Sequence, residues 1–224
     1  MKTIAVIHTD FHEKFGIPRQ SGIVTDTVGR IVFEPEYRNP DALRGITEFS
    51  HLWLIWLLSE SVRERWSPTV RPPRLGGNRR MGVFATRSPF RPNPLGLSSV
   101  RLLGTEETAE GTVLLVGGAD LLDGTPILDI KPYLPYTDSH PDAVGGFADA
   151  VAGDRVSVVI SPEFLVKIKD HDQKIIEKLL AHDPRPSYQE DPLREYYMTY
   201  GNLEITFRVA GSVLTVTNIR DITS

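Results

Sequence analysis

The amino-acid sequence predicts a mainly β protein, with a β-barrel-like N-terminal domain over residues 1–161 and a small α+β C-terminal domain over residues 162–224. Two observations predict this fold class. Short apolar runs bounded by Gly, Pro and Asp recur through the first two-thirds of the chain with few helical stretches between them, which is typical of a barrel or a coiled sheet. A helical apolar pattern appears late in the chain, and two strand-like runs follow it.

The strands expected in the first domain are short and closely spaced. They lie at residues 3–7, 22–28, 30–35, 52–58, 81–85, 98–103, 111–116 and 155–160. Residues 41–46 have the pattern of a short helical turn.

The second domain is expected to begin with a helix over residues 162–181. Its apolar residues fall near helical spacing, Pro162 stands at its start, and Asp183-Pro184 stops it. Two strand-like runs, residues 203–209 and 213–219, are joined at Gly211 as a hairpin. This change of pattern places a domain boundary near residue 162.

Composition restricts the class of protein. A chain of 224 residues can build one sizeable core, or a main domain and a small one. The absence of cysteine excludes disulfides, thiolate zinc sites and cysteine nucleophiles, and it fits a reducing cytoplasm, where we expect the protein. The N-terminal apolar run breaks at His8, so no signal peptide is expected. The longest apolar run, residues 49–58, is about half of the roughly 20 residues that a membrane helix needs.

Charge is unevenly distributed along the chain. The formal net charge is −4, yet the segment from Arg63 to Arg101 carries nine arginines, no lysine and one acid, Glu64. Arginine binds phosphate through two parallel hydrogen bonds and stacks on bases, so this segment suits RNA. A solubilising surface with scattered ion pairs would give the same pattern.

Several common site motifs are missing. No G-x-G-x-x-G follows a strand and opens a helix, so the sequence does not support a Rossmann-type site for a dinucleotide or a methyl donor. His8 and His12 have the spacing of metal ligands on a helix, but the apolar run before them leads into a loop. Histidines that face solvent or lie in the core are favoured there, and no metal is expected.

Three segments rich in Pro, Gly, Arg and Asp read as site loops instead. In residues 14–22 (KFGIPRQSG), Pro and Gly can present backbone donors to a ligand, although an ordinary loop would look the same. In residues 85–98, three prolines exclude a helix and hold Arg87 and Arg91 in a rigid loop, which loses little entropy on binding. The alternative is a structural network that pairs these two arginines with acids of the third segment.

The third segment, residues 120–136, alternates acids with apolar residues. Its acids are Asp120, Asp123 and Asp129. A tight turn at Gly124 exposes backbone groups that can hold an adenine or a ribose. Acids beside it favour a cationic or hydroxyl-rich ligand, and a sulfonium nucleoside is both. Tyr133 and Tyr136 could stack on a base or pack in the core.

Together with residues 49–53 (FSHLW), 69–77 (TVRPPRLGG) and 183–188 (DPRPSY), these segments resemble the motif series of the TrmO/TsaA (YaeB-like) family, in the same order. The resemblance implies a non-Rossmann methyltransferase built on a β-barrel-like domain. Its members use S-adenosylmethionine to methylate N6 of threonylcarbamoyl-adenosine (t6A) at position 37, beside the anticodon of threonine tRNA. It also implies a homodimer with the cofactor near the subunit interface.

The resemblance assigns site residues by position. The cofactor contacts that it implies are Gln20, Ser21, Gly22, Ser59, Glu60, Arg87, Leu97, Asp123, Gly124, Thr125 and Pro126. Ser59 and Glu60 stand where relatives carry a His-Gln-like pair. The tRNA contacts expected from the basic segment and from the resemblance are Arg71, Arg74, Arg91, Arg185 and Tyr188.

The chemistry of methyl transfer suggests two further residues. Displacement at a sulfonium is in-line, so the protein must mainly hold N6 against the methyl carbon and exclude water. The urea-like nitrogen must also lose a proton, which makes Asp129 and Lys131 candidates for proton acceptance or orientation. The competing hypotheses are an S-adenosylmethionine-binding β-barrel protein that acts on another substrate, and a non-catalytic RNA-binding module.

Overall fold

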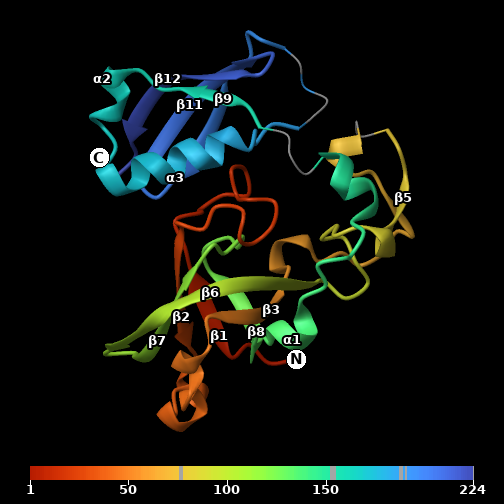
Figure 1. Cartoon of the computed structure of the whole chain (residues 1–224), viewed down its shortest axis with the longest axis vertical. Helices are drawn as coiled ribbons and strands as arrows, with labels where there is room; N and C mark the ends of the chain where they lie inside the picture. Colours follow the sequence, from red (N-terminus) through yellow and green to blue (C-terminus); the bar gives the residue numbers. More distant parts are fainter. Residues whose placement is uncertain (76–77, 152–154, 187–188, 190, 224) are drawn as a thin grey trace.

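The computed structural model describes residues 1–75, 78–151, 155–186, 189 and 191–223. Its main body is a closed antiparallel barrel, and a second sheet with helices lies beyond one end of that barrel (Figure 1). The mainly β fold class and the small α+β C-terminal domain are therefore confirmed.

Six strands form the barrel in the order β1-β2-β7-β6-β3-β8. They are β1 (Ala5–His8), β2 (Val28–Phe33), β3 (His51–Leu57), β6 (Leu95–Thr108), β7 (Gly111–Gly117) and β8 (Thr125–Pro132). Alternate residues point inward, so Ile7, Ile31, Leu54, Leu114 and Ile127 are fully buried in one cluster. This alternation is the signal that made most of these strands predictable.

Of the strands expected in the first domain, one is wrong and one is right only in part, and two strands were missed. Residues 22–27 are a loop, because Val24 turns away from the barrel and is buried in the core of the second domain. Residues 81–85 contain only β5 (Met81–Gly82), which pairs with β4 (Thr69–Val70) and runs into the 3₁₀ turn Val83–Ala85. Strand β8 was interpreted as a loop because it contains prolines, which stand at its second and last positions, where a missing N–H is tolerated.

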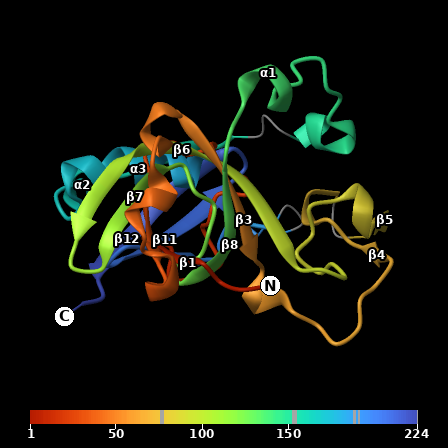
Figure 2. The ribbon, with the colours of Figure 1, turned by 90° about the horizontal axis from the view of Figure 1, so that it is seen from below.

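Shorter elements surround the barrel. The segment between β2 and β3 contains the 3₁₀ turns Pro35–Tyr37, Pro40–Leu43 and Ile46–Glu48, where one turn over residues 41–46 was expected. Residues 58–94, which we call the arginine lobe, project to one side with β4, β5 and the 3₁₀ turns Ser59–Ser61 and Pro73–Leu75 (Figure 2). The short helix α1 (Pro135–Asp138) and the 3₁₀ helix Gly146–Val151 follow β8.

The second sheet has the order β10-β11-β12-β9. Its strands are β9 (Ser157–Val159), β10 (Tyr196–Tyr200), β11 (Leu203–Ala210) and β12 (Val213–Asp221). Strand β9 runs parallel to β12, so the sheet begins a few residues before the expected boundary near residue 162. The hairpin of β11 and β12 confirms the two strand-like runs at the end of the chain.

The helical pattern of residues 162–181 forms two helices rather than one, α2 (Pro162–Leu165) and α3 (Asp170–Ala181). At the break, the side chain of Gln173 donates to the carbonyls of Leu165 and Ile168 at 3.1 and 3.2 Å. Helix α3 buries Ile175 and Leu180 in the core that it forms with the sheet. Among the described residues, no helix is long and apolar enough to cross a membrane.

Residues 9–27, between β1 and β2, leave the barrel and complete the second domain (Figure 1). Phe11 is 2% exposed within the second core, and Phe15 stacks on Tyr196 at 6.5 Å between ring centroids. Gly16 lies against Met198, where a Cβ would approach Cγ to 2.4 Å, and its φ of +92° also requires glycine. The two domains are therefore joined by shared packing as well as by the chain.

Candidate cofactor site and RNA interface

The turn predicted to hold a nucleoside lies at the end of the barrel that faces the second domain. Thr125 pairs with Ile7, so the start of β8 lies beside the end of β1. The N–H of Asp123 donates to Phe11 O at 2.8 Å, and the N–H of Gly124 donates to Ile7 O at 2.9 Å. Gly124 has a φ of +77°, a conformation that glycine adopts without strain. This turn is fixed by backbone hydrogen bonds on both sides.

The carboxylate of Asp123 is held between two histidines. Its Oδ1 accepts from the N–H of Thr9 at 3.1 Å and lies 3.1 Å from His8 Nδ1. Its Oδ2 lies 3.9 Å from His12 Nδ1. The described residues contain no group of three or more His, Cys, Asp or Glu side chains arranged to hold a metal ion. The carboxylate is oriented but still one-third exposed, so a ligand can reach it.

The loop at Gln20 lies beside this turn. The guanidinium of Arg87 donates to the side-chain oxygen of Gln20. The N–H of Gly22 donates to Gly118 O at 2.9 Å, which ties the loop to the segment after β7. The first two site loops, far apart in sequence, therefore meet at Gln20 and Arg87.

Asp120 is a further residue of this site, which sequence analysis counted among the acids of the third segment but did not assign to the cofactor contacts. Its carboxylate accepts from Ser98 Oγ at 2.6 Å and from the backbone N–H of Ser21. Trp56 Nε1 in turn donates to Ser98 Oγ at 3.0 Å. Burial raises the pKa of Asp120, and these hydrogen bonds and the charge of Arg87 oppose that rise. Asp120 thus joins the barrel wall to the loop at Ser21.

The three acids of residues 120–136 have different partners. The charge of Arg87 acts on Asp120. Asp123 faces His8 and His12 instead, and Asp129 forms an ion pair with Lys131 at 3.0 Å. The guanidinium of Arg87 bonds to Gln20 and its charge opposes the raised pKa of Asp120, but among the described residues no ion pair joins Arg87 to any of the three acids.

Ser59 and Glu60 lie in the 3₁₀ turn Ser59–Ser61, close to the first site loop. Lys14 Nζ donates to Glu60 O at 3.1 Å. Leu97 stands on the outer face of β6 and is 59% exposed, an unusual exposure for a leucine in a strand. The expected cofactor residues therefore gather at one end of the barrel, with Leu97 on the adjoining outer wall.

The candidate proton acceptors lie further along β8. Ile55 of β3 pairs with Leu97 on one side and with Asp129 on the other, so these three side chains form a row across three strands. Four residues of strand separate Asp129 from Thr125, which is about 13 Å. Asp129 and Lys131 therefore lie on the outer barrel wall, with Asp129 in the same row as Leu97, rather than beside the turn at Asp123.

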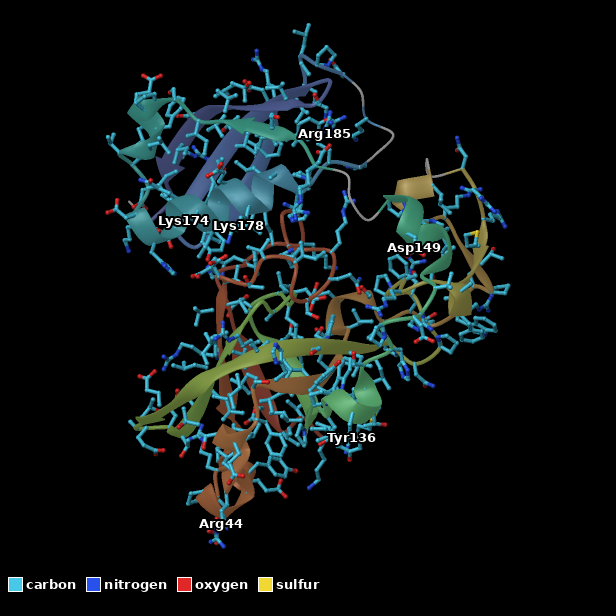
Figure 3. The ribbon with its side chains drawn as sticks, in the orientation of Figure 1. Arg44, Tyr136, Asp149, Lys174, Lys178 and Arg185 are labelled. Atoms are coloured by element: carbon cyan, nitrogen blue, oxygen red, sulfur yellow. The ribbon has the colours of Figure 1, made fainter. Side chains whose placement is uncertain are left out.

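The two tyrosines after β8 differ. Tyr133 packs against Trp53 with ring centroids 5.5 Å apart, and Trp53 Nε1 donates to Asp138 at 2.8 Å. Tyr136 is 86% exposed on α1 and projects from the barrel (Figure 3). Tyr133 packs against Trp53 on the outside of the barrel rather than in the core, whereas Tyr136 is open to a partner.

Some of the residues expected to contact tRNA are exposed, whereas others bond to the protein itself. Arg71 is exposed, whereas Arg91 donates to the carbonyls of Val83 and Thr86 at 3.2 and 2.7 Å. Arg185 is bound by both carboxylate oxygens of Asp183 at 2.9 and 2.8 Å, which raises the pKa of Arg185. The side chain of Arg74 and the whole of Tyr188 lie outside the described residues.

The arginine lobe also carries exposed aromatic rings that sequence analysis did not single out. Trp66 stacks on Phe84 at 6.1 Å between centroids, and the guanidinium of Arg63 lies 3.5 Å from the ring centre of Phe90. Trp66 and Phe84 are both more than half exposed. Exposed rings next to arginines are the groups on which unpaired bases stack.

Two family models match this chain: the tRNA-methyltransferase O N-terminal domain over residues 6–139 and the TrmO C-terminal domain over residues 154–222. The tRNA (adenine(37)-N6)-methyltransferase of Escherichia coli strain K12 is 40% identical over 92% of this chain and 91% of that protein. A candidate S-adenosylmethionine-dependent methyltransferase of Pseudomonas aeruginosa is 42% identical over 90% of this chain and 89% of that protein. A crystal structure of TrmO from P. aeruginosa has a TM-score of 0.80 at 34% identity and covers 98% of this chain and 95% of that chain. The similarity extends over both domains.

Proposed function

Because this chain belongs to the TrmO family of tRNA methyltransferases, we propose that it transfers a methyl group from S-adenosylmethionine to N6 of adenine 37 in tRNA. The E. coli relative carries this activity in its name and aligns with nine-tenths of this chain. We further propose that the methylated base is t6A in threonine tRNA. The observation that carries the proposal is that Gln20 bonds to Arg87 and Ser21 to Asp120, three residues before the turn at Asp123, in a chain that matches the family over both domains.

The residues at the barrel end fit a sulfonium nucleoside. Asp123 presents an oriented carboxylate, which can accept hydrogen bonds from ribose hydroxyls and favours a nearby cation. Leu97 presents an apolar side chain to an adenine ring. The donor supplies a methyl group on a positively charged sulfur, and no acid or base of the protein is needed to activate it.

In this proposal, the outer barrel wall receives the substrate base. A base lying over Ile55 would touch Leu97 on one side and Asp129 on the other, because two strand spacings of about 4.8 Å separate the outer members of that row. Asp129 could then accept the proton that leaves N6, and Lys131, its ion-pair partner, would hold that carboxylate in position. The remaining contribution of the chain is proximity and exclusion of water.

The arginine lobe is proposed to bind the tRNA. Arg71 is free to contact phosphate, and Trp66 and Phe84 can stack on unpaired bases of the anticodon loop. Arg91 and Arg185 bond inward, so in our proposal they shape the loops that carry the contacts. A homodimer is also proposed, because a second copy would cover exposed apolar side chains such as Leu97 and complete the donor site near the interface.

A direct test is methyl transfer to tRNA. The protein is incubated with labelled S-adenosylmethionine and either tRNA that contains t6A or the same tRNA made without it, and nucleosides are separated by mass. We expect one added methyl on t6A and none on unmodified adenosine. Transfer to adenosine 37 without t6A would overturn the proposed substrate. Donor binding without transfer to any tRNA would overturn the proposed function in favour of another substrate.

A further inference from the structure

Arg19, directly before the cofactor loop, reaches across to the second domain. Its guanidinium NH2 donates to the carbonyl oxygens of Asp183 at 2.8 Å and Arg185 at 3.2 Å. These carbonyls belong to the segment between α3 and β10, within the DPRPSY sequence. Arg19 is thus separated from its partners by more than 160 residues of sequence, and its side chain points away from the barrel end.

The carbonyls that Arg19 binds are presented by a preformed turn. Asp183 has a φ of +46°, the one positive φ among the described residues that are not glycine. Its Oδ1 accepts from the Arg185 N–H at 3.2 Å, and the Arg185 guanidinium, 11% exposed, binds both of its carboxylate oxygens. Arg185 also donates to Gln189 O at 3.3 Å, and Figure 3 shows it at the second domain. Such a buried two-point contact fixes backbone direction.

On its other side, the same loop is bound to the barrel. Gln20 is bonded to Arg87, the N–H of Ser21 to Asp120, and the N–H of Gly22 to Gly118 O. Four consecutive residues, 19 to 22, therefore bridge two domains. A change in the direction of the Asp183 turn must move the residues that the family resemblance assigns to the donor.

We propose that Arg19 is a positioning residue, which lets the Asp183–Arg185 turn of the second domain hold the donor loop at residues 20–22 in its binding conformation. This inference rests on the proposed function for the identity of the ligand. It gives Arg185 a role other than phosphate binding, since its guanidinium already donates to both carboxylate oxygens of Asp183. The Asp183–Arg185 turn then contributes to donor binding without touching the donor.

The first measurement needs no ligand. Amide hydrogen exchange at Ser21 and Gly22 reports the loop directly, because their N–H groups bond to Asp120 and Gly118. We expect Arg19→Ala to speed this exchange about tenfold, since a hydrogen bond from a charged donor is lost. Arg19→Lys should restore part of the protection, because an ammonium can still donate to a carbonyl. Unchanged exchange in Arg19→Ala would overturn the inference whatever the ligand is.

The second measurement is the affinity for S-adenosylmethionine by calorimetry. Arg19→Ala should weaken it about tenfold. Asp183→Gly, which deletes the carboxylate while permitting the left-handed backbone, should weaken it similarly. Because both changes break one connection, the double variant should lose little more than either single variant. Additive losses would overturn the connection through this turn.

Lys178→Ala is the matched control. Lys178 of α3 pairs with Asp26, so it also joins the second domain to residues 9–27, but through a residue four positions after the donor loop. We expect donor affinity within about twofold of the unaltered protein, as for a partly exposed ion pair. An equal loss in this control would show that general domain packing, not Arg19, sets the donor site. If the unaltered protein binds no donor but exchange responds to Arg19, the proposed function fails while the positioning role stands.

Discussion

The barrel end and the arginine lobe are both rich in polar loop residues, yet they are built in opposite ways. At the barrel end, Gln20, Asp120 and Asp123 each have protein partners, and the backbone around them is bonded to β1 and to the segment after β7. In the lobe, Arg71, Trp66 and Phe84 lie exposed. The first region suits a small ligand that must be held in one geometry. The second suits a large, charged partner, such as a folded RNA, whose own structure sets the geometry of the contacts.

The largest expected effect is at Arg87. Arg87→Ala removes the bond to Gln20 and the positive charge near Asp120, so donor affinity should fall by roughly 10- to 100-fold in calorimetry. The thermal midpoint should change little, because Arg87 lies on a loop. Loss of folding without a specific loss of donor affinity would mean that Arg87 has only a structural role. The barrel end would then no longer differ from the lobe as a ligand site.

The exposed part of the lobe, away from the Arg87–Gln20 contact, should respond to salt rather than to the donor. Arg71→Ala should weaken tRNA binding about fivefold near physiological salt and lower the slope of log affinity against log salt by about 1. Donor affinity should be unchanged. Arg91→Ala is the internal control, since its guanidinium bonds to two carbonyls and its loss should leave that slope as it was. Equal slopes in all three proteins would remove Arg71 from the interface.

The smallest expected effect is on the pH dependence of stability, and it concerns Asp120. Burial raises the pKa of its carboxyl above the unfolded value, so this group stabilises the fold in its protonated form. That contribution is present below the unfolded pKa and is lost as pH rises through the folded pKa. Relative to Asp120→Asn, the free energy of unfolding of the unaltered protein should therefore decline with pH from about 4 upward. Urea titrations across that range measure it, and parallel curves would contradict the raised pKa.

Sequence patterns predicted the strands that have a regular apolar pattern. They missed the segments whose structure depends on packing against distant parts of the chain. Alternation revealed β1, β2, β3, β6 and β7, and the hairpin of β11 and β12 followed from Gly211 between two apolar runs. Strand β10 was missed, since its tyrosines and Met198 follow a Pro-rich stretch that resembles a loop. Residues 22–27 have strand-forming side chains, but they form a loop whose Val24 is buried in the second core.

The sequence by itself determined the fold class, the position of the three site loops and the family, because each depends on residue types in local order. Only the tertiary structure decided which acid lies within range of the charge of Arg87, and which arginines face outward. It also decided how residues 9–27 complete the second domain. Those choices join residues up to 166 positions apart. A local pattern shows which polar and apolar side chains a segment contains. Packing between distant segments then decides which of these side chains pair, because buried polar groups need hydrogen-bond partners.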